Sequence, residues 1–192
     1  LVLISSIPIP YQIEKYAILH NEKLEAVLPY LVNEAKRLEK AGADFIVLPC
    51  NSLHLFVNEI RKEIQIPLLS IIEETVKYLS IEKINRIGIL STSVTNKHQL
   101  YDDELNKANI KFDRLSDTDQ QEVDQIIYRI VKGKFTQVDE TMLSACMNRY
   151  SDCGSILLAC TDLQILVENQ HKMKVYDTMK ILAESTCEYI CS

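Results

Sequence analysis

Two cysteines occupy matching places in two similar stretches of the chain. Cys50 follows the apolar run 45–48 with one proline between them, and Cys160 follows the run 156–158 with one alanine between them. Two short polar residues and a leucine come after each cysteine. A free thiol has a pKa of about 8.5, so it can exchange protons not far from neutral pH. Two thiols that face one small ligand would therefore supply a proton acceptor and a proton donor.

Each cysteine is expected where a buried parallel strand turns into a helix. The apolar runs are too short for helices and lack the polar alternation of a half-buried strand. The polar pair after each cysteine can cap a following helix, and the partial positive charge at a helix N-terminus is expected to lower the thiol pKa. Ligands of open α/β sheets bind at the carboxyl ends of the strands. The pattern predicts one cleft with a sulfur on each wall.

Strands alternate with helices along the rest of the chain, which predicts an α/β protein of two similar lobes, each a parallel sheet flanked by helices. The first lobe is expected over residues 1–82, completed by the C-terminal helix at 183–192, and the second over residues 83–182. Residues 1–4 are expected to form a strand. A kink or restart is expected at Pro29 and a left-handed helix cap at Gly42.

The overall composition argues against a nucleic-acid-binding or membrane-spanning protein. The net charge is −6, the lysines form no basic stripe, and no apolar run is long enough to span a bilayer. Six cysteines in a chain of 192 residues are expected to be mostly free thiols in the reducing cytoplasm. Their spacing favours packing over metal ligation, and no metal or pyridoxal signature is present.

One thiolate and one thiol on opposite faces of a substrate form the arrangement for inverting a carbon centre. One sulfur removes a proton from carbon, and the other returns a proton from the opposite face. The planar carbanion between the two steps needs hydrogen-bond donors around the carboxylate that takes up its charge. Short polar side chains near the two cysteines can supply these donors: Asn51, Ser52, Thr92, Thr95 and Thr161.

The chain resembles the aspartate/glutamate racemase family, most closely the aspartate racemases that need no pyridoxal phosphate. The matching segments are residues 42–52, 66–75, 91–95 with Tyr101, and 159–162. The resemblance implies two α/β lobes related by pseudo-twofold symmetry, with the active site between them, and a homodimer. It also implies that Cys50 and Cys160 are the acid/base pair, that no cofactor is needed, and that Asn51, Ser52 and the Leu53 backbone hold the substrate.

Several positions depart from the family pattern. Lys132 matches a substrate-contacting lysine of the family only if one residue is deleted before Gly133. Gln12 stands where aspartate racemases carry an arginine for a substrate carboxylate, and a neutral amide cannot form the same charged bidentate pair. Ala159 and Asp162 replace the usual glycine and glutamate on either side of the second Cys-Thr pair. The prediction is an acidic amino-acid substrate, aspartate rather than glutamate.

Other functions remain open on the sequence alone. One is a decarboxylase or isomerase of the same superfamily that uses a single cysteine. Another is a ligand-binding relative without catalysis, which the change at Gln12 would suit. A redox or metal-binding protein is a third.

Overall fold

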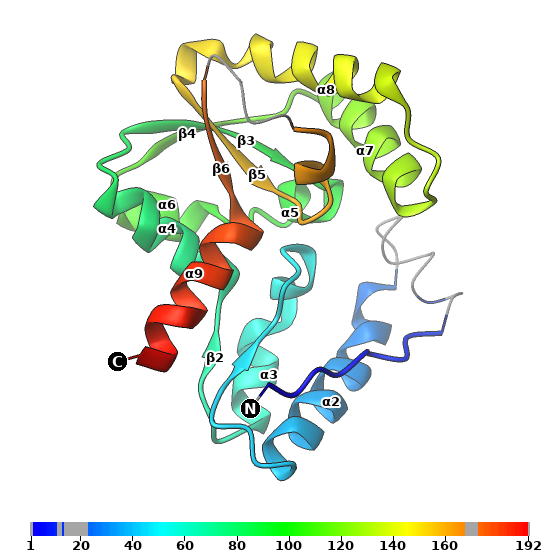
Figure 1. Ribbon diagram of the computed structural model, residues 1–192, viewed down its shortest axis with the longest axis vertical. Helices are drawn as coiled ribbons and strands as arrows, with labels where there is room; N and C mark the ends of the chain where they lie inside the picture. The colour runs from blue at the N-terminus through cyan, green and yellow to red at the C-terminus, as the bar shows by residue number, and fades with distance from the viewer. Residues whose placement is uncertain (1, 11–12, 14–22, 168–172, 192) are drawn as a thin grey trace. The chain divides into compact units, whose positions relative to one another are not determined.

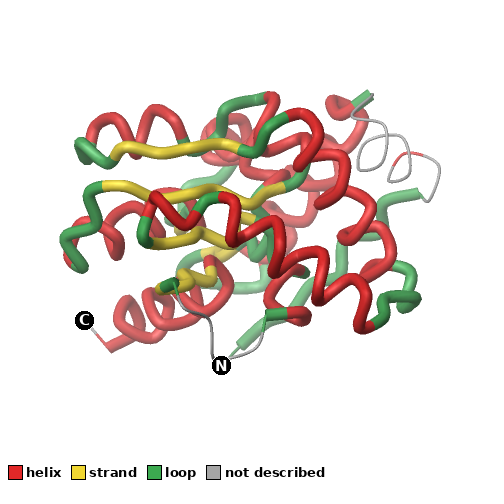
Figure 2. The backbone as a smooth tube through the Cα atoms, turned by 90° about the horizontal axis from the view of Figure 1, so that it is seen from above, coloured by secondary structure: helices red, strands yellow, loops and turns green. Residues whose placement is uncertain are grey.

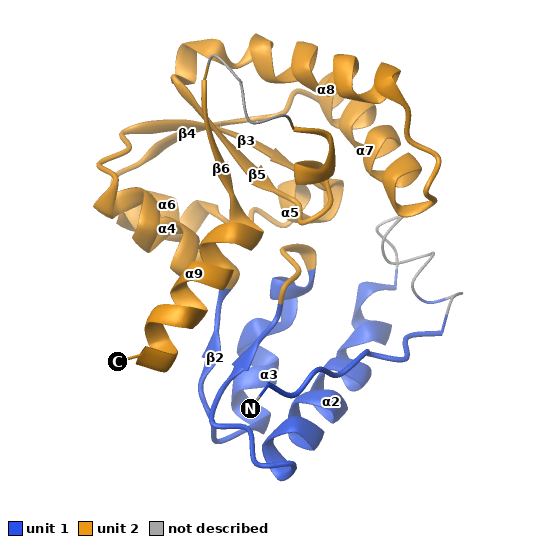
Figure 3. Cartoon of the chain, viewed as in Figure 1, with its two compact units in different colours: residues 1–48, 53–70 blue, residues 49–52, 71–192 orange. Residues whose placement is uncertain are grey.

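The computed structural model describes residues 2–10, 13, 23–167 and 173–191 (Figure 1). The chain divides into two compact units (Figure 3). Unit 1 consists of Leu1–Leu48 and Leu53–Ser70, and unit 2 of Pro49–Ser52 and Ile71–Ser192. Unit 2 therefore includes a four-residue segment that unit 1 flanks on both sides in the sequence.

Unit 2 is built on a parallel sheet of four strands in the order β4-β3-β5-β6. The strands are β3 (Arg86–Ser91), β4 (Lys111–Arg114), β5 (Ser155–Ala159) and β6 (Lys174–Asp177). All neighbouring pairs are parallel, and β3 and β5 pair at the centre. Every residue of β5 is buried, as expected for an apolar strand covered on both faces. The predicted parallel sheet flanked by helices is thereby confirmed.

Helices cover both faces of this sheet (Figures 1 and 2). They are α4 (Ile71–Ile81), α5 (Ser93–Lys97), α6 (Asp102–Lys107), α7 (Asp117–Val131), α8 (Gln137–Arg149) and α9 (Thr178–Cys191). The apolar sides of α7 and α8 share one buried core with Leu90, Ile156 and Leu158 of the central strands. On the other face α4 packs against α9, and the rings of Tyr78 and Tyr176 meet edge to face.

Close packing between the central strands explains one glycine. Gly88 lies opposite Ile156 in the pairing of β3 with β5. A Cβ atom at Gly88 would lie 2.9 Å from Cδ1 of Ile156 and 3.1 Å from Cβ of Tyr150. Only glycine therefore fits at this point without displacing the core side chain of the neighbouring strand.

Unit 1 is smaller, and its described residues form two short strands beside two α-helices. Its elements are the 3-10 helix η2 (Leu24–Val27), α2 (Leu28–Lys40), β1 (Ile46–Val47), the 3-10 helix η3 (Ser52–Phe56, whose first residue lies in unit 2), α3 (Val57–Glu63) and β2 (Leu68–Leu69). β1 pairs with β2 in parallel. The α-helix restarts at Leu28 with Pro29 in its first turn, and Gly42 has a φ of 89°, so both of these predictions are confirmed.

Two predicted elements are wrong. Residues 2–4 of the strand expected at 1–4 form no strand. Val2 is 78% and Ile4 93% exposed, so burial of apolar side chains does not stabilise a strand there. The helix expected after Cys160 is only a 3-10 turn, η5 (Leu163–Leu166), because Val167 already has an extended backbone and Asp162 makes no side-chain cap.

The compact units differ from the predicted lobes in where they divide. The predicted division falls after residue 82, whereas α4 groups with unit 2, where it packs against α9. The division into two lobes stays a prediction. Among the described residues, no helix has the length and apolar character needed to cross a membrane.

Candidate active site

The two cysteines lie in the same compact unit. Cys50 is part of Pro49–Ser52, the short segment that groups with unit 2, and Cys160 follows β5 of the same unit. Their surroundings differ, because Cys50 is half-buried and Cys160 is only 4% exposed. Within the described residues, neither sulfur is part of a disulfide bond. Two thiols of one unit are thus available for chemistry in different surroundings.

Burial controls the protonation of Cys160. It raises the pKa of this thiol to about 12, because a thiolate would lose its hydration inside the protein. The backbone N–H groups of Asp162 and Leu163 oppose the rise, whereas negative charge on Asp162 or Cys50 adds to it. The expected lowering of this pKa is therefore wrong. A 3-10 turn directs two N–H groups at the sulfur, and they do not outweigh the cost of burying a charge.

Asp162 is the acidic side chain beside Cys160. The Cys160 thiol donates to Oδ2 of Asp162 over 3.9 Å, a long contact for a weak donor. Burial raises the pKa of Asp162, and the contact with Cys160 lowers it. Negative charge on this half-buried carboxylate adds to the rise in the pKa of the thiol, because a second negative charge so close is unfavourable.

Three hydroxyl groups of unit 2 meet, one from the Cys50 segment and two from the loop and first turn after β3. Oγ of Ser52 lies 2.8 Å from Oγ1 of Thr92 and 3.4 Å from Oγ1 of Thr95. Thr92 donates to Thr95 over 3.2 Å. The structure therefore brings together three of the predicted donors, Ser52, Thr92 and Thr95, in a cluster that can turn hydroxyl protons toward an anion.

The loop that carries two of these hydroxyls is anchored by its own helix and by α7. Thr92 caps α5 by accepting the N–H of Thr95 at 3.2 Å. From α7, Asp124 accepts the N–H of Ser93 at 3.0 Å, and Gln120 donates to the Ser91 carbonyl at 2.9 Å. These bonds fix the loop before any ligand arrives, which lowers the cost of ordering it on binding.

The side chain of Asn51 belongs to a buried chain of hydrogen bonds. Tyr101 donates its hydroxyl to Oδ1 of Asn51 at 2.5 Å. Nδ2 of Asn51 donates to Oγ1 of Thr178 at 3.0 Å, and Thr178 donates to the Leu158 carbonyl at 2.9 Å. Asn51 and Tyr101 are each 2% exposed and Thr178 is fully buried. Burial also raises the pKa of Tyr101, so its hydroxyl stays a donor.

Sequence reasoning missed Thr178. Its hydroxyl occupies the first position of α9, directly after the carboxyl end of β6, on the side of the sheet where ligands of parallel sheets gather. A threonine directly after a predicted strand could therefore have indicated a site residue. Tyr101 belongs to the segments that resemble the family, but the sequence does not indicate that its hydroxyl bonds to Asn51.

The remaining predicted residues are spread more widely. Thr161 is half-buried next to Cys160, and Leu53 begins the second stretch of unit 1. Lys132 ends α7, is exposed, and has Nζ 5.9 Å from the ring centre of Tyr128. Gln12 lies outside the described residues. The roles expected for these four residues stay predictions.

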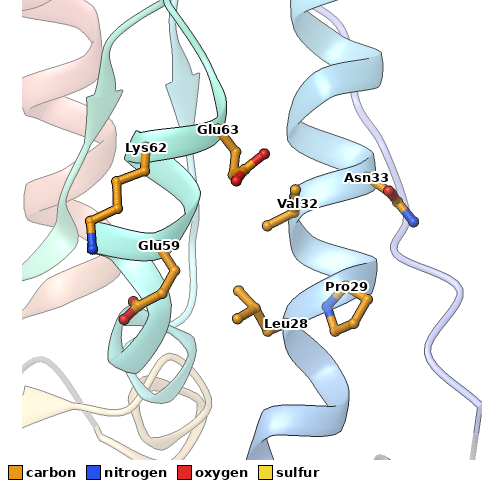
Figure 4. A pocket seen from close by; sticks show the side chains of 7 residues that line it. All are labelled: Leu28, Pro29, Val32, Asn33, Glu59, Lys62 and Glu63. Atoms are coloured by element: carbon orange, nitrogen blue, oxygen red, sulfur yellow. The ribbon is translucent and has the colours of Figure 1, made fainter.

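Other features of the described residues are separate from the cysteines. A cavity of about 430 Å³ lies between α2 and α3 of unit 1 (Figure 4). It is lined by Leu28, Pro29, Val32, Asn33, Glu59, Lys62 and Glu63, none of them a predicted site residue. Within the part of the chain that the structure describes, no cluster of three or more His, Cys, Asp or Glu side chains could hold a metal ion.

Comparison with known proteins agrees with the fold and the motifs. The chain is 31% identical over 187 residues to the broad specificity amino-acid racemase RacX of Bacillus subtilis, covering 96% of this chain and 79% of that protein. A crystal structure of an Asp/Glu racemase candidate from Yersinia pestis superposes with a TM-score of 0.81 at 27% identity, over 95% of this chain and 80% of that one.

The aspartate racemase of Picrophilus torridus has the same fold, with a TM-score of 0.79 at 22% identity over 95% of this chain and 75% of that chain. The family model described as Asp/Glu/hydantoin racemase matches residues 1–186. The resemblance inferred from the sequence is confirmed, and the chain belongs to the Asp/Glu/hydantoin racemase family.

Proposed function

We propose that this protein racemises an acidic amino acid, aspartate in preference to glutamate, with Cys50 and Cys160 as the two bases. The observation that carries the proposal is the placement of the two thiols. Cys50 and Cys160 belong to the same compact unit, and each comes shortly after the carboxyl end of a parallel strand. This placement agrees with the family to which the chain belongs.

The two thiols share one proton in the reacting enzyme. Cys160 keeps its proton over the neutral range because burial raises its pKa to about 12. The half-buried Cys50 acts as the thiolate and takes the α-proton, so that an S–H bond forms as the C–H bond breaks. Cys160 then gives its proton to the opposite face of the planar carbanion. In the reverse reaction Cys160 starts as the thiolate and Cys50 carries the proton. No cofactor enters either step.

Hydroxyl and backbone N–H groups stabilise the charge that develops on the substrate. The cluster of Ser52, Thr92 and Thr95 provides hydroxyl donors beside the Cys50 segment. Backbone N–H groups of the turn after Cys160 point at its sulfur and stabilise negative charge on it. Donors fixed before the reaction stabilise a developing charge without the cost of reorganising solvent.

The substrate preference follows from the resemblance to aspartate racemases. In this proposal Gln12 and Lys132 contact the second carboxylate of the substrate. RacX, the 31% identical relative, is described as a broad specificity enzyme, so the test must also include neutral and basic amino acids. We expect a homodimer, which light scattering on the purified protein would measure.

The test is an NMR exchange experiment in D₂O on the D and L forms of aspartate, glutamate, alanine and lysine. We expect deuterium to enter the α-carbon of both aspartate enantiomers, and Cys50→Ala or Cys160→Ala to lower racemisation at least about 1,000-fold. Cys187→Ala removes an exposed thiol of α9 and is the matched control.

Three results would contradict the proposal. Unchanged turnover in either active-site variant would remove the two-base mechanism. Faster exchange of a neutral or basic amino acid than of aspartate would remove the acidic preference. Release of CO₂ from a substituted malonate, without exchange of any amino acid, would assign a decarboxylase instead.

A further inference from the structure

We propose that Tyr101 and Thr178 are positioning residues, which hold the Cys50 sulfur in place for proton transfer by fixing the Asn51 amide. The idea rests on the proposed function, because it assigns residues that serve the same pair of thiols. It gives Asn51 a role in holding the segment, which is distinct from contact with the substrate. Three groups of observations support it.

The first is the direction of each hydrogen bond. The Thr178 hydroxyl has one proton and donates it to the Leu158 carbonyl, so toward Asn51 it can only accept. Asn51 must therefore turn Nδ2 toward Thr178 and Oδ1 toward the Tyr101 hydroxyl, which donates to it at 2.5 Å. Each donor in the chain has its acceptor, and only one orientation of the amide satisfies all of them.

The second is where the chain of bonds ends. Leu158 belongs to β5, and Cys160 directly follows this strand. The neighbour of one catalytic sulfur is thus tied, through a single threonine side chain, to the strand that positions the other sulfur. Because all members are nearly or fully buried, water cannot replace a lost partner without entering the core.

The third is a second attachment on the next residue. Ser52 bonds to Thr92 over 2.8 Å, so the two residues that follow Cys50 are both held by unit 2. The strand before Cys50 and the helix after it belong to unit 1, yet the segment Pro49–Ser52 groups with unit 2. These side-chain bonds give a physical reason for that grouping.

Loss of the attachment should impair catalysis more than substrate binding. Proton transfer requires the reacting atoms at near-contact distance, and a displacement of about 1 Å can cost roughly 100-fold in rate. We expect Tyr101→Phe and Thr178→Val to lower kcat about 10- to 100-fold and to change KM less than about threefold. Thr178→Ser keeps the hydroxyl and should restore most of the rate.

Two control variants remove comparable hydrogen bonds elsewhere in unit 2. Thr186→Val removes a hydroxyl that donates to the Leu182 carbonyl at 2.6 Å on the same helix as Thr178. Tyr150→Phe removes a phenol that donates to Asp119 at 2.7 Å. We expect both controls to keep kcat within about threefold of the wild type, whatever they do to thermal stability.

A second readout does not depend on turnover. Cys50 alkylation by iodoacetamide, followed by peptide mass spectrometry, reports how accessible and how mobile this segment is. We expect Tyr101→Phe and Thr178→Val to speed the alkylation of Cys50 at least about fivefold, and Thr178→Ser and both controls to leave it near the wild-type rate.

The two readouts separate the possible failures. If the wild-type protein exchanges no α-proton, the proposed function fails, and the alkylation rates alone decide whether Asn51 is held as described. Wild-type kcat and wild-type alkylation in both Tyr101→Phe and Thr178→Val would overturn the positioning role. Equal losses of kcat in the positioning variants and in the controls would overturn it too, because that result indicates general destabilisation.

Discussion

The two cysteine-bearing turns share a sequence pattern and differ in almost everything around it. Cys160 follows a five-residue strand at the centre of a four-stranded sheet, whereas the strand before Cys50 has two residues in a sheet of two. Cys160 is nearly fully buried and Cys50 is half-buried. The repeated motif therefore places a thiol at each turn, and burial determines how readily the Cys160 thiol loses its proton.

This difference suits a reaction that needs an acid and a base at the same time. In the proposed reaction, two identical sites would compete equally for one proton, whereas burial raises the pKa of Cys160 and favours the proton there. The half-buried Cys50 would then start as the acceptor. The difference between the two turns can be tested by changing the strands, by measuring the reactivity of the two thiols, and by changing Asp162 beside Cys160.

The largest effect should come from the strands themselves. Ile156→Ala in β5 removes a fully buried side chain from the core that α7 and α8 share, and we expect a loss of about 4 kcal/mol in the free energy of unfolding. Ile46→Ala in β1 is the matched change in the short strand. It should cost about 2 kcal/mol, because a two-residue strand can collapse around the cavity.

Urea denaturation followed by circular dichroism measures both losses. Equal costs at the two positions would contradict the view that β5 sits in the more rigid surroundings. A change in the denaturant slope would point to an altered unfolded state, so the comparison requires equal slopes.

The sulfurs should differ next in their reactivity. At pH 8 we expect iodoacetamide to modify Cys160 at least about 100-fold more slowly than Cys50, because Cys160 is buried and its raised pKa leaves little thiolate. Peptide mass spectrometry over a time course gives both rates in one sample. Comparable rates would mean that burial does not protect Cys160.

Alkaline pH should reveal the buried thiol in the stability of the protein. The pKa of Cys160 rises from about 8.5 in the unfolded chain to about 12 in the folded protein. Between these values the unfolded state has lost a proton that the folded state keeps, so the free energy of unfolding falls as the pH rises. The contribution of Cys160 is complete below about pH 8.5, and above it is lost by up to about 1.4 kcal/mol per pH unit.

Cys160→Ala removes that contribution and should flatten the alkaline decline by the same slope. Urea denaturation at pH 8 to 10.5 measures it. Parallel curves for the wild type and the variant would show that Cys160 titrates normally in the folded protein.

The smallest effect concerns the carboxylate beside Cys160. Asp162→Asn removes a negative charge that raises the pKa of the thiol, so the alkylation profile of Cys160 should move toward lower pH by about one unit or less. Asp152→Asn is the control, since it removes an exposed carboxylate next to Cys153. A shift toward higher pH in Asp162→Asn would contradict the assigned cause.

Much of the fold could be predicted from the sequence, because burial leaves a strong pattern. The apolar run before Cys160 is a strand buried on both faces, and Pro29 and Gly42 mark the start and the end of α2. The strand expected at residues 1–4 is a wrong prediction, since the apolar side chains there resemble those of a strand whereas Val2 and Ile4 are exposed in the structure.

The parts that could not be predicted depend on contacts between distant residues. Asn51 and Thr178 are 127 positions apart, and nothing local to either residue indicates the bond between them. The pKa of Cys160 was predicted in the wrong direction for a related reason. The turn after a cysteine can be read from its neighbours in sequence, whereas the depth of burial depends on how the whole unit packs.

The segment Pro49–Ser52 has a consequence for dissecting the protein. A fragment that starts at Ile71 would contain almost all of unit 2 and still lack the first thiol, because those four residues are encoded between two stretches of unit 1. Cutting the chain at one point therefore cannot produce one fragment that contains both sulfur atoms and another that contains the complete unit 1. Expressing the protein as separate fragments would require the fragments to reassemble. For a fragment that starts at Ile71, a synthetic peptide around Cys50 would be the smallest addition that supplies the first thiol.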